Sequence, residues 1–175
     1  MIKITKTTTI LIIILSIITI TSCKEEITLV GKSGRSLEIL VDKPIKLENL
    51  DFVHLNGQYN RLFPKASNRI LALVEVTVIN RTSTVVPLKI DEDSSTLGDS
   101  RGEILKPLNP FKNNQLINIP NEPIKDIYSP LLWGEIELAR NTEVSGWMVF
   151  DVPRGLRLNS FTWDEVDYII TGLIE

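Results

Sequence analysis

A single histidine and a single cysteine limit the nucleophilic chemistry open to this sequence of 175 residues. The histidine, His54, lies between the apolar residues Val53 and Leu55, a setting more typical of a structural residue than of a general base. A cysteine–histidine nucleophile pair or a mixed zinc site would need Cys23, for which the N-terminal sequence indicates another use. We therefore predict no catalytic residue and no cofactor. A polar site near His54, in an enzyme or an inhibitor, is the alternative.

The acidic run Asp91-Glu92-Asp93 is the one cluster whose residue types suggest a metal ion. Calcium takes about six to eight oxygen ligands, and an EF-hand loop supplies them at alternate positions, with glycine sixth and glutamate twelfth. Counting from Asp91 places Asp93 third and Asp99 ninth, but the sixth residue is threonine and the twelfth is glycine. We expect a solvated loop and no metal. The alternative is a calcium site between strands that uses Asp91, Asp93 and Asp99.

The first 22 residues have the composition of a targeting segment and are set aside from the fold. Lys3 and Lys6 give the N-terminus a positive charge, and no further charged residue occurs before Lys24. The almost wholly apolar stretch Ile10–Ile18 is shorter than the about 20 residues that a membrane-spanning helix needs. Residues 1–22 are therefore predicted to be a signal peptide that is cleaved on export.

The residues that end this segment, Ile20-Thr21-Ser22-Cys23, resemble the lipobox of bacterial lipoproteins. The resemblance implies that Cys23 receives a diacylglycerol group, that the chain is cut before it, and that acyl chains such as palmitate hold the protein on a membrane. Two or more acyl chains anchor a protein stably without a membrane-spanning helix. Residues 23–26 would then be the lipidated cysteine and a short tether. A lone cysteine fits this role, because exported domains normally use cysteines in pairs.

The charges after the cysteine bear on where the protein lies. Lys24-Glu25-Glu26 is similar to the surface-export signal of Bacteroidetes lipoproteins, which implies display on the cell surface. We otherwise expect attachment to the cell membrane or the outer membrane. Without Lys3 and Lys6, 17 of the 19 basic residues remain against 22 acidic ones, which gives a net charge of −5. No basic cluster interleaves with aromatic residues, so we expect no nucleic-acid partner.

Strand-like runs dominate residues 27–175, which we expect to form one domain. The strongest is Arg69–Asn80, where the even-numbered residues from Ala72 to Val78 alternate with a second set and would line a core face. A turn is expected over Gly31–Gly34, and a turn or two of helix is the alternative over 45–52 and 123–128. Seven to nine short strands of this kind indicate an antiparallel β-sandwich. Further strands are predicted over residues 27–30, 36–41, 84–90, 133–138, 144–152, 158–163 and 168–173, and the stretch Leu97–Leu105 contains the turn tetrad Asp99-Ser-Arg-Gly102, with glycine where a positive φ is easiest.

The middle of the chain, Lys106–Pro130, holds five prolines and shows little periodicity. Prolines remove backbone donors and interrupt strand ladders, so we expect a long irregular connection. Loops of this length are uncommon in compact domains and are often functional. Tyr128 and Trp133, at the end of this connection, are therefore the candidates for a surface that contacts a partner.

From Arg69 to the C-terminus the sequence resembles the DUF4352, or telokin-like, family of immunoglobulin-like extracellular domains. The resemblance rests on a strand that ends in Asn80, on the hairpin Leu97-Gly-Asp-Ser-Arg-Gly102, and on Gly146-Trp-Met-Val-Phe-Asp-Val-Pro153. In the last motif Gly146 would let a neighbouring backbone approach closely, and the tryptophan after it would anchor a core. The resemblance implies an all-β fold, an immunoglobulin-like antiparallel β-sandwich, in a family that is frequent among lipoproteins and has no common activity.

Together these features predict a membrane-anchored lipoprotein with a non-catalytic immunoglobulin-like domain. We expect this domain to bind or scaffold a protein or another component of the cell envelope. One alternative is a cell-envelope enzyme or inhibitor with a polar site near His54. The other is a passive component of the surface coat.

Overall fold

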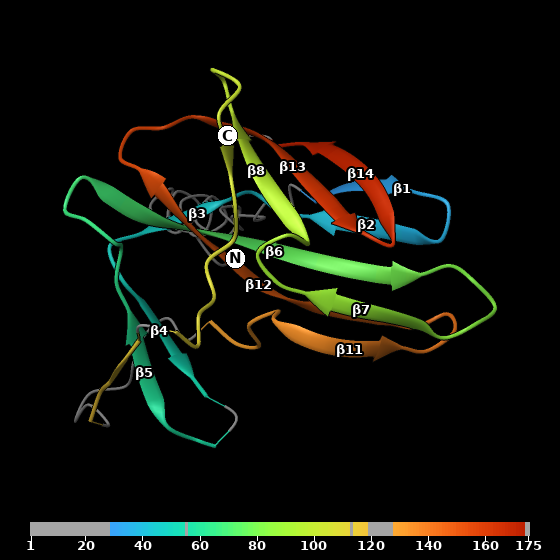
Figure 1. Cartoon of the computed structure of the whole chain (residues 1–175), viewed down its shortest axis with the longest axis horizontal. Coiled ribbons are helices and arrows are strands. Elements are labelled where there is room, and N and C mark those ends of the chain that lie inside the picture. Colours follow the sequence, from blue (N-terminus) through green and yellow to red (C-terminus); the bar gives the residue numbers. More distant parts are fainter. Residues whose placement is uncertain (1–28, 55, 113, 119–127, 174–175) are drawn as a thin grey trace, which may run out of the picture.

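The computed structural model describes residues 29–54, 56–112, 114–118 and 128–173, and every regular element in these ranges is a β-strand. All pairs of strands are antiparallel, which confirms the predicted all-β class (Figure 1). No helix in the described part of the chain is long and apolar enough to cross a membrane. In chain order the strands are β1 (Val30–Ser33), β2 (Leu37–Val41), β3 (Ile45–Leu47), β4 (Leu50–Val53), β5 (Tyr59–Leu62), β6 (Arg69–Asn80), β7 (Val86–Ile90), β8 (Ser95–Asp99), β9 (Ile104–Leu105), β10 (Gln115–Leu116), β11 (Gly134–Leu138), β12 (Glu143–Pro153), β13 (Leu158–Glu165) and β14 (Asp167–Gly172).

One layer of the fold is built around the long strands β6 and β12. They pair along their whole length, from Arg69 opposite Pro153 to Ile79 opposite Glu143. The other edge of β6 is shared by β2, which pairs with its second half, and β3, which pairs with its first half. Since β1 pairs with β2, the sheet order is β1-β2-β6-β12.

The opposite layer consists of the sheet β14-β13-β8-β9 and the two-stranded ribbon β7–β11. Side chains from both layers form the main core, in which Phe150, Phe161 and Trp163 are fully buried. The even-numbered residues from Ala72 to Val78 lie in this core, as the alternation in β6 predicted. Two antiparallel layers that enclose one apolar core make the fold sandwich-like.

A small third sheet, β10-β5-β4, lies against the other face of the β6–β12 pair and projects at the lower left of Figure 1. Leu71 and Leu73 of β6 are buried beneath it, on the face opposite the main core. The helical alternative for residues 45–52 is therefore wrong. Leu50 and Phe52 occupy alternate positions of a strand, and both point into this second core. The fully buried members of the second core are Leu50, Phe52, Leu62, Leu71, Leu73 and Val149.

The proline-rich segment is fixed to the sandwich at both ends. An isolated bridge near each end joins it to the edge of β12 that β6 leaves free. The N–H of Trp147 donates to the carbonyl of Pro130 at 2.9 Å, and a Cβ on Gly146 would stand 2.7 Å from that carbonyl oxygen. The close backbone approach predicted at Gly146 is thus confirmed. Residues 113 and 119–127 lie outside the described residues.

The turn between β1 and β2 lies later in the chain than predicted, because Gly31 belongs to β1. The carboxylate of Asp167, at the start of β14, accepts hydrogen bonds from the backbone N–H groups of Ser36 at 2.6 Å and Leu37 at 2.7 Å. A side chain from the opposite layer thus accepts the hydrogen bonds of two backbone N–H groups at the end of the turn. The carboxylate therefore ties the two layers together at this end of the sandwich.

Candidate functional site

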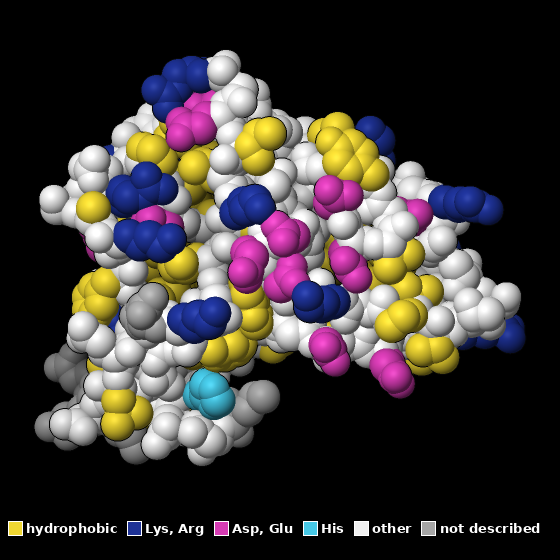
Figure 2. Space-filling model, viewed as in Figure 1, with side chains coloured by type: hydrophobic (Ala, Val, Ile, Leu, Met, Phe, Trp, Pro, Cys, Tyr) yellow, Lys and Arg dark blue, Asp and Glu magenta, His cyan; other side chains and the backbone are white. Residues whose placement is uncertain are grey.

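Two adjoining cavities lie where the small sheet meets the sandwich, and together we call them the basic cleft. The larger, of about 660 Å³, is bounded by the start of β6, the end of β12 and residues 104–109. The smaller, of about 280 Å³, is bounded by the end of β5 and by β10. Figure 2 shows Lys and Arg side chains gathered at this end of the molecule, beside a separate group of acidic side chains at its centre. The cations that line the cleft are Lys65, Arg69, Lys106 and Lys112.

Arg69 is held in place by Asp151, the last polar residue of β12. Its Nε donates to the Asp151 carboxylate at 2.6 Å, and one terminal nitrogen donates to the Asp151 carbonyl. The same carboxylate accepts the N–H of Lys65 at 3.3 Å, so the connection from β5 to β6 is fixed to β12. Since Asp151 is buried, this pair is a rigid part of the wall of the cleft.

Lys106 also has a carboxylate partner, on the rim of the larger cavity. Its ammonium donates to the Asp93 carboxylate at 2.5 Å. This hydrogen bond, with the attraction of the neighbouring acids, raises the pKa of the Lys106 ammonium above its usual value. The pair is exposed, so it contributes little to stability and leaves the ammonium free to exchange partners.

Lys65 and Lys112 differ from the other two cations. Both line both cavities, and neither ammonium has an ion-pair partner among the residues that the structure describes. The apolar side chains of Phe63, Pro64 and Leu108 lie in the smaller cavity beside them, and Phe63 is 42% exposed. Glu92 also lines the larger cavity, but the cations outnumber the carboxylates in the lining, so the cleft combines an excess of positive charge with an exposed aromatic ring.

A third cavity, of about 560 Å³, lies on the outer face of the β7–β11 ribbon and is mostly acidic. Glu135, Glu137 and Glu165 line it together with Lys89. The carboxylate of Glu165 accepts the backbone N–H of Lys89 at 3.0 Å, and the Lys89 ammonium pairs with Asp91 at 2.9 Å. Glu135 and Glu137 have no ion-pair partner among the described residues, so this face keeps unneutralised negative charge, the opposite of the charge at Lys65 and Lys112.

The acids proposed as calcium ligands are each engaged separately. Asp91 pairs with Lys89, and Asp93 pairs with Lys106. Asp99 is buried and accepts hydrogen bonds from the backbone N–H groups on either side of Gly102 in its turn. No group of three metal-ligating side chains gathers anywhere in the described ranges of the chain.

His54 lies at the end of β4, outside all three cavities. Its ring packs edge-on against Phe111, with ring centroids 5.2 Å apart. Its Nδ1 faces the N–H of Asn56 at 3.5 Å, and no hydrogen bond joins it to a serine or a carboxylate within the described ranges. His54, the best candidate for a catalytic base, thus has no serine or carboxylate partner among the described residues.

The residues Gly98-Asp-Ser-Arg-Gly102 also have the Gly-x-Ser-x-Gly spacing of a hydrolase nucleophile turn. That turn joins a strand to a helix, whereas these residues join β8 to β9 in a hairpin. The N–H of Ser100 donates to the carbonyl of Arg157 at 3.2 Å, and Gly102 has a φ of +83°. The spacing therefore belongs to a turn with glycine at the left-handed position, as the sequence predicted for this tetrad.

The aromatic residues predicted as a contact surface are half-buried. The ring of Tyr128 meets Trp147 edge-on, with centroids 5.1 Å apart, and both pack against the second core. Trp147 therefore acts as a core anchor, as its motif predicted. Trp133 lies directly before β11, away from the lining of the cleft. Cys23 lies outside the described residues.

Sequence reasoning did not identify the basic cleft. Lys65 and Lys112 lie in different connections and belong to no motif, so only the folded chain brings them to one cavity. The exposure of the Phe63 ring, directly after β5, is likewise visible only in the structure. Comparison of the chain with protein-family models, curated proteins and solved structures gives no match. The geometry of the cleft is therefore the basis for a functional proposal.

Proposed function

We propose that this protein is a membrane-anchored lipoprotein whose non-catalytic, immunoglobulin-like domain binds a component of the cell envelope through the basic cleft. The observation that carries the proposal is the pair Lys65 and Lys112, two cations without acidic partners in the described structure, beside the exposed ring of Phe63. A mature chain with a net charge of −5, from 17 basic and 22 acidic residues, gathers an excess of positive charge here. Such a field attracts and orients an anionic partner.

The anchor in this proposal is lipid on Cys23. The lipobox-like run Ile20-Thr21-Ser22-Cys23 supports it, and so does the use of the only cysteine at that position. The first described strand begins at Val30, so the tether before the domain would be short. At no more than about 3.6 Å per residue, it would keep the domain close to the membrane surface.

The immunoglobulin-like assignment is supported by two antiparallel layers around one core and by the motif at Gly146–Pro153, whose residues take the places that the motif assigns. Domains of this architecture commonly serve as binding modules, with function in their loops. The cleft fits that expectation, because residues 63–69 and 104–112 are mostly connections between strands.

The two alternatives gain less support. An enzyme or inhibitor would need a polar site at His54, which instead packs against Phe111. A passive coat component would need no cavity with unneutralised charge. The cleft therefore favours a binding module over both.

Photo-crosslinking in intact cells tests the binding role. A photoreactive residue in place of Phe63 in the full chain should give a discrete crosslinked product with one envelope component. The same residue in place of Val85, which is 56% exposed and outside the cleft, serves as the control. A product from Val85 equal to that from Phe63, or none from Phe63, contradicts the proposal.

Fractionation tests the anchor independently. The wild-type chain should sediment with membranes, and Cys23→Ser should move it to the soluble fraction or leave it as the uncleaved precursor. Protease treatment of intact cells then distinguishes display on the surface from an inward-facing position. A Cys23→Ser chain that is still processed and membrane-bound would contradict lipid anchoring.

A further inference from the structure

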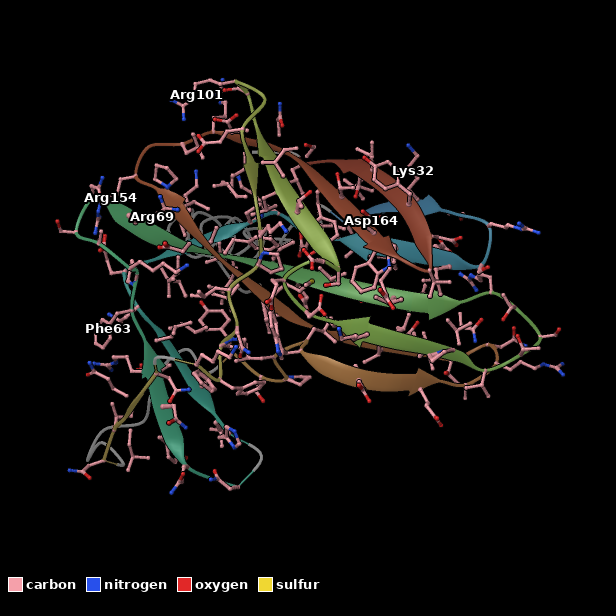
Figure 3. All side chains as sticks on the ribbon, in the orientation of Figure 1. Lys32, Phe63, Arg69, Arg101, Arg154 and Asp164 are labelled. Carbon is pink, nitrogen blue, oxygen red and sulfur yellow. The ribbon has the colours of Figure 1, made fainter. Side chains whose placement is uncertain are left out.

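We infer that the ligand of the basic cleft is an acidic oligosaccharide, with a carboxylate between Lys65 and Lys112 and a sugar ring against Phe63. The inference rests on the proposed function, because it names the chemical class that the same cleft would take. Figure 3 shows Phe63 and Arg69 at the same end of the molecule, with Phe63 beyond the small sheet's β5 and Arg69 at the start of β6.

The charge of the cleft selects an anion. Lys65 and Lys112 come from two connections, one after β5 and one before β10, which the antiparallel pairing of these strands brings to the same end of the small sheet, and both line the two cavities. Neither ammonium is paired within the described residues, whereas Arg69 and Lys106 each hold a carboxylate. An anion placed between two like charges gains attraction from both and relieves their repulsion.

The uncharged groups of the cleft select a sugar. Phe63 and Pro64 offer apolar surface to one face of a ring, next to the side-chain amide of Gln115. In the larger cavity Asn109 uses its carbonyl oxygen to accept the N–H of Phe111 at 2.9 Å, and its amide nitrogen has no partner in the described structure. An amide can both donate to and accept from hydroxyl groups. The amides would thus bind the hydroxyl groups of an acidic sugar, the aromatic face would pack against its ring, and the two lysines would bind its carboxylate.

An acidic peptide would bring the same charge, and one way in which extended peptides bind is by adding a strand to a free sheet edge. β5, the strand nearest the cleft, is paired with β4 on one side and β10 on the other. The outer edge of β12 is covered where the N–H of Leu108 donates to the carbonyl of Val149 at 2.6 Å. β9 and β10, which line the cleft, are edge strands of their sheets in the described structure, but each spans only two residues, which is a short edge for an added strand.

Calorimetric titration of the full chain in detergent micelles tests the inference with three probes. These are a tetramer of galacturonic acid, the same tetramer with its carboxyls methyl-esterified, and a hexamer of glutamate. Of the three probes, we expect only the unesterified tetramer to bind, and we expect its affinity to fall at high salt. Lys65→Gln with Lys112→Gln should weaken binding about tenfold or more, because charge-assisted hydrogen bonds are lost. Phe63→Ala should also weaken it, and Lys32→Gln, far from the cleft in Figure 3, should not.

Three outcomes overturn the inference: no binding of the tetramer, equal binding of its methyl ester, or binding of the glutamate hexamer that is as tight and as sensitive to the double substitution. Each leaves the proposed function intact if the crosslink from position 63 persists. Loss of that crosslink, by contrast, removes the proposed function itself.

Discussion

The main core and the second core lie on opposite faces of the same two strands, yet they are built very differently. On the main face, the long strands β6 and β12 meet a layer of further strands, and large side chains such as Phe150, Phe161 and Trp163 fill the space between them. On the other face, strands of two to four residues cover Leu71 and Leu73. The same two strands, β6 and β12, thus contribute side chains to two cores of unequal size.

This difference bears on function because the basic cleft lies at the junction of the two regions. Arg69 and Asp151 belong to the sandwich, whereas Leu62 and Gln115 belong to the small sheet. Regions with few buried contacts open at lower free energy than the rest of a protein. We therefore expect the small sheet to open before the sandwich, and the cleft to open with it.

The largest effect is expected from Phe161→Ala in the main core. The ring is fully buried and meets Phe150 edge-on at 6.4 Å, so its loss leaves a cavity between the layers. We expect a loss of about 3–5 kcal/mol in the free energy of unfolding. Guanidinium unfolding followed by circular dichroism measures it. A loss below about 1 kcal/mol would show that the core is not packed as described.

Phe52→Ala is the matched substitution in the second core. This ring is 1% exposed and meets Phe111 edge-on at 6.0 Å. We expect a loss of about 2–3 kcal/mol in the same experiment, because the small sheet can open while the sandwich stays folded. Fluorescence of Trp147, which packs against this core, should change before circular dichroism does. Equal losses from both phenylalanines would make the two regions a single cooperative unit.

Gly146→Ala tests the attachment of the proline-rich segment to β12. The new methyl group would stand 2.7 Å from the carbonyl oxygen of Pro130, which is backbone and must shift. We expect a loss of about 1–2 kcal/mol. Gly172→Ala is the control, since a Cβ there meets nothing within 4 Å. Similar denaturation midpoints for the two variants would mean that the contact at Gly146 carries no constraint.

The smallest effect is a pH dependence at Asp99. Burial raises the pKa of its carboxyl, but hydrogen bonds from the Arg101 side chain and from two backbone N–H groups outweigh burial and lower it below 3.8. A depressed pKa in the folded state means that the stabilisation is present above this value and is lost as the pH falls below it. The difference in unfolding midpoint between the wild type and Asp99→Asn should therefore narrow from pH 7 towards acid. A constant difference would count against this role.

The long strands were predictable because their alternation is complete. In β6 the even-numbered residues from Ala72 to Val78 showed the main core face, and in β12 the Gly146–Pro153 motif showed both its faces and the close approach. The second core was not predictable in the same way. Its strands are too short to show a period, and Leu71 and Leu73 are covered by residues from distant segments.

The cleft could not be predicted for a related reason. The sequence singled out the proline-rich segment as functional, and one wall of the cleft does belong to it. Lys65, however, lies in a short connection with no motif, and Lys112 lines the same cavity only because β10 pairs with β5. A pairing of two residues leaves no pattern in a sequence. The Asp91–Asp99 acids, in contrast, formed a visible cluster, and each took a separate partner.

Native-state hydrogen exchange of the full chain tests most directly whether the cleft lies between two regions of different stability. The backbone amides of β4 and β5 should exchange through a local opening, at a lower free energy than those of β6 and β12. Phe161→Ala should lower the second group and leave the first unchanged, because a local opening of the small sheet does not expose that ring, which is buried in the main core. If all four strands exchange at one common free energy in the wild type, the small sheet is an inseparable part of the sandwich and the account is contradicted.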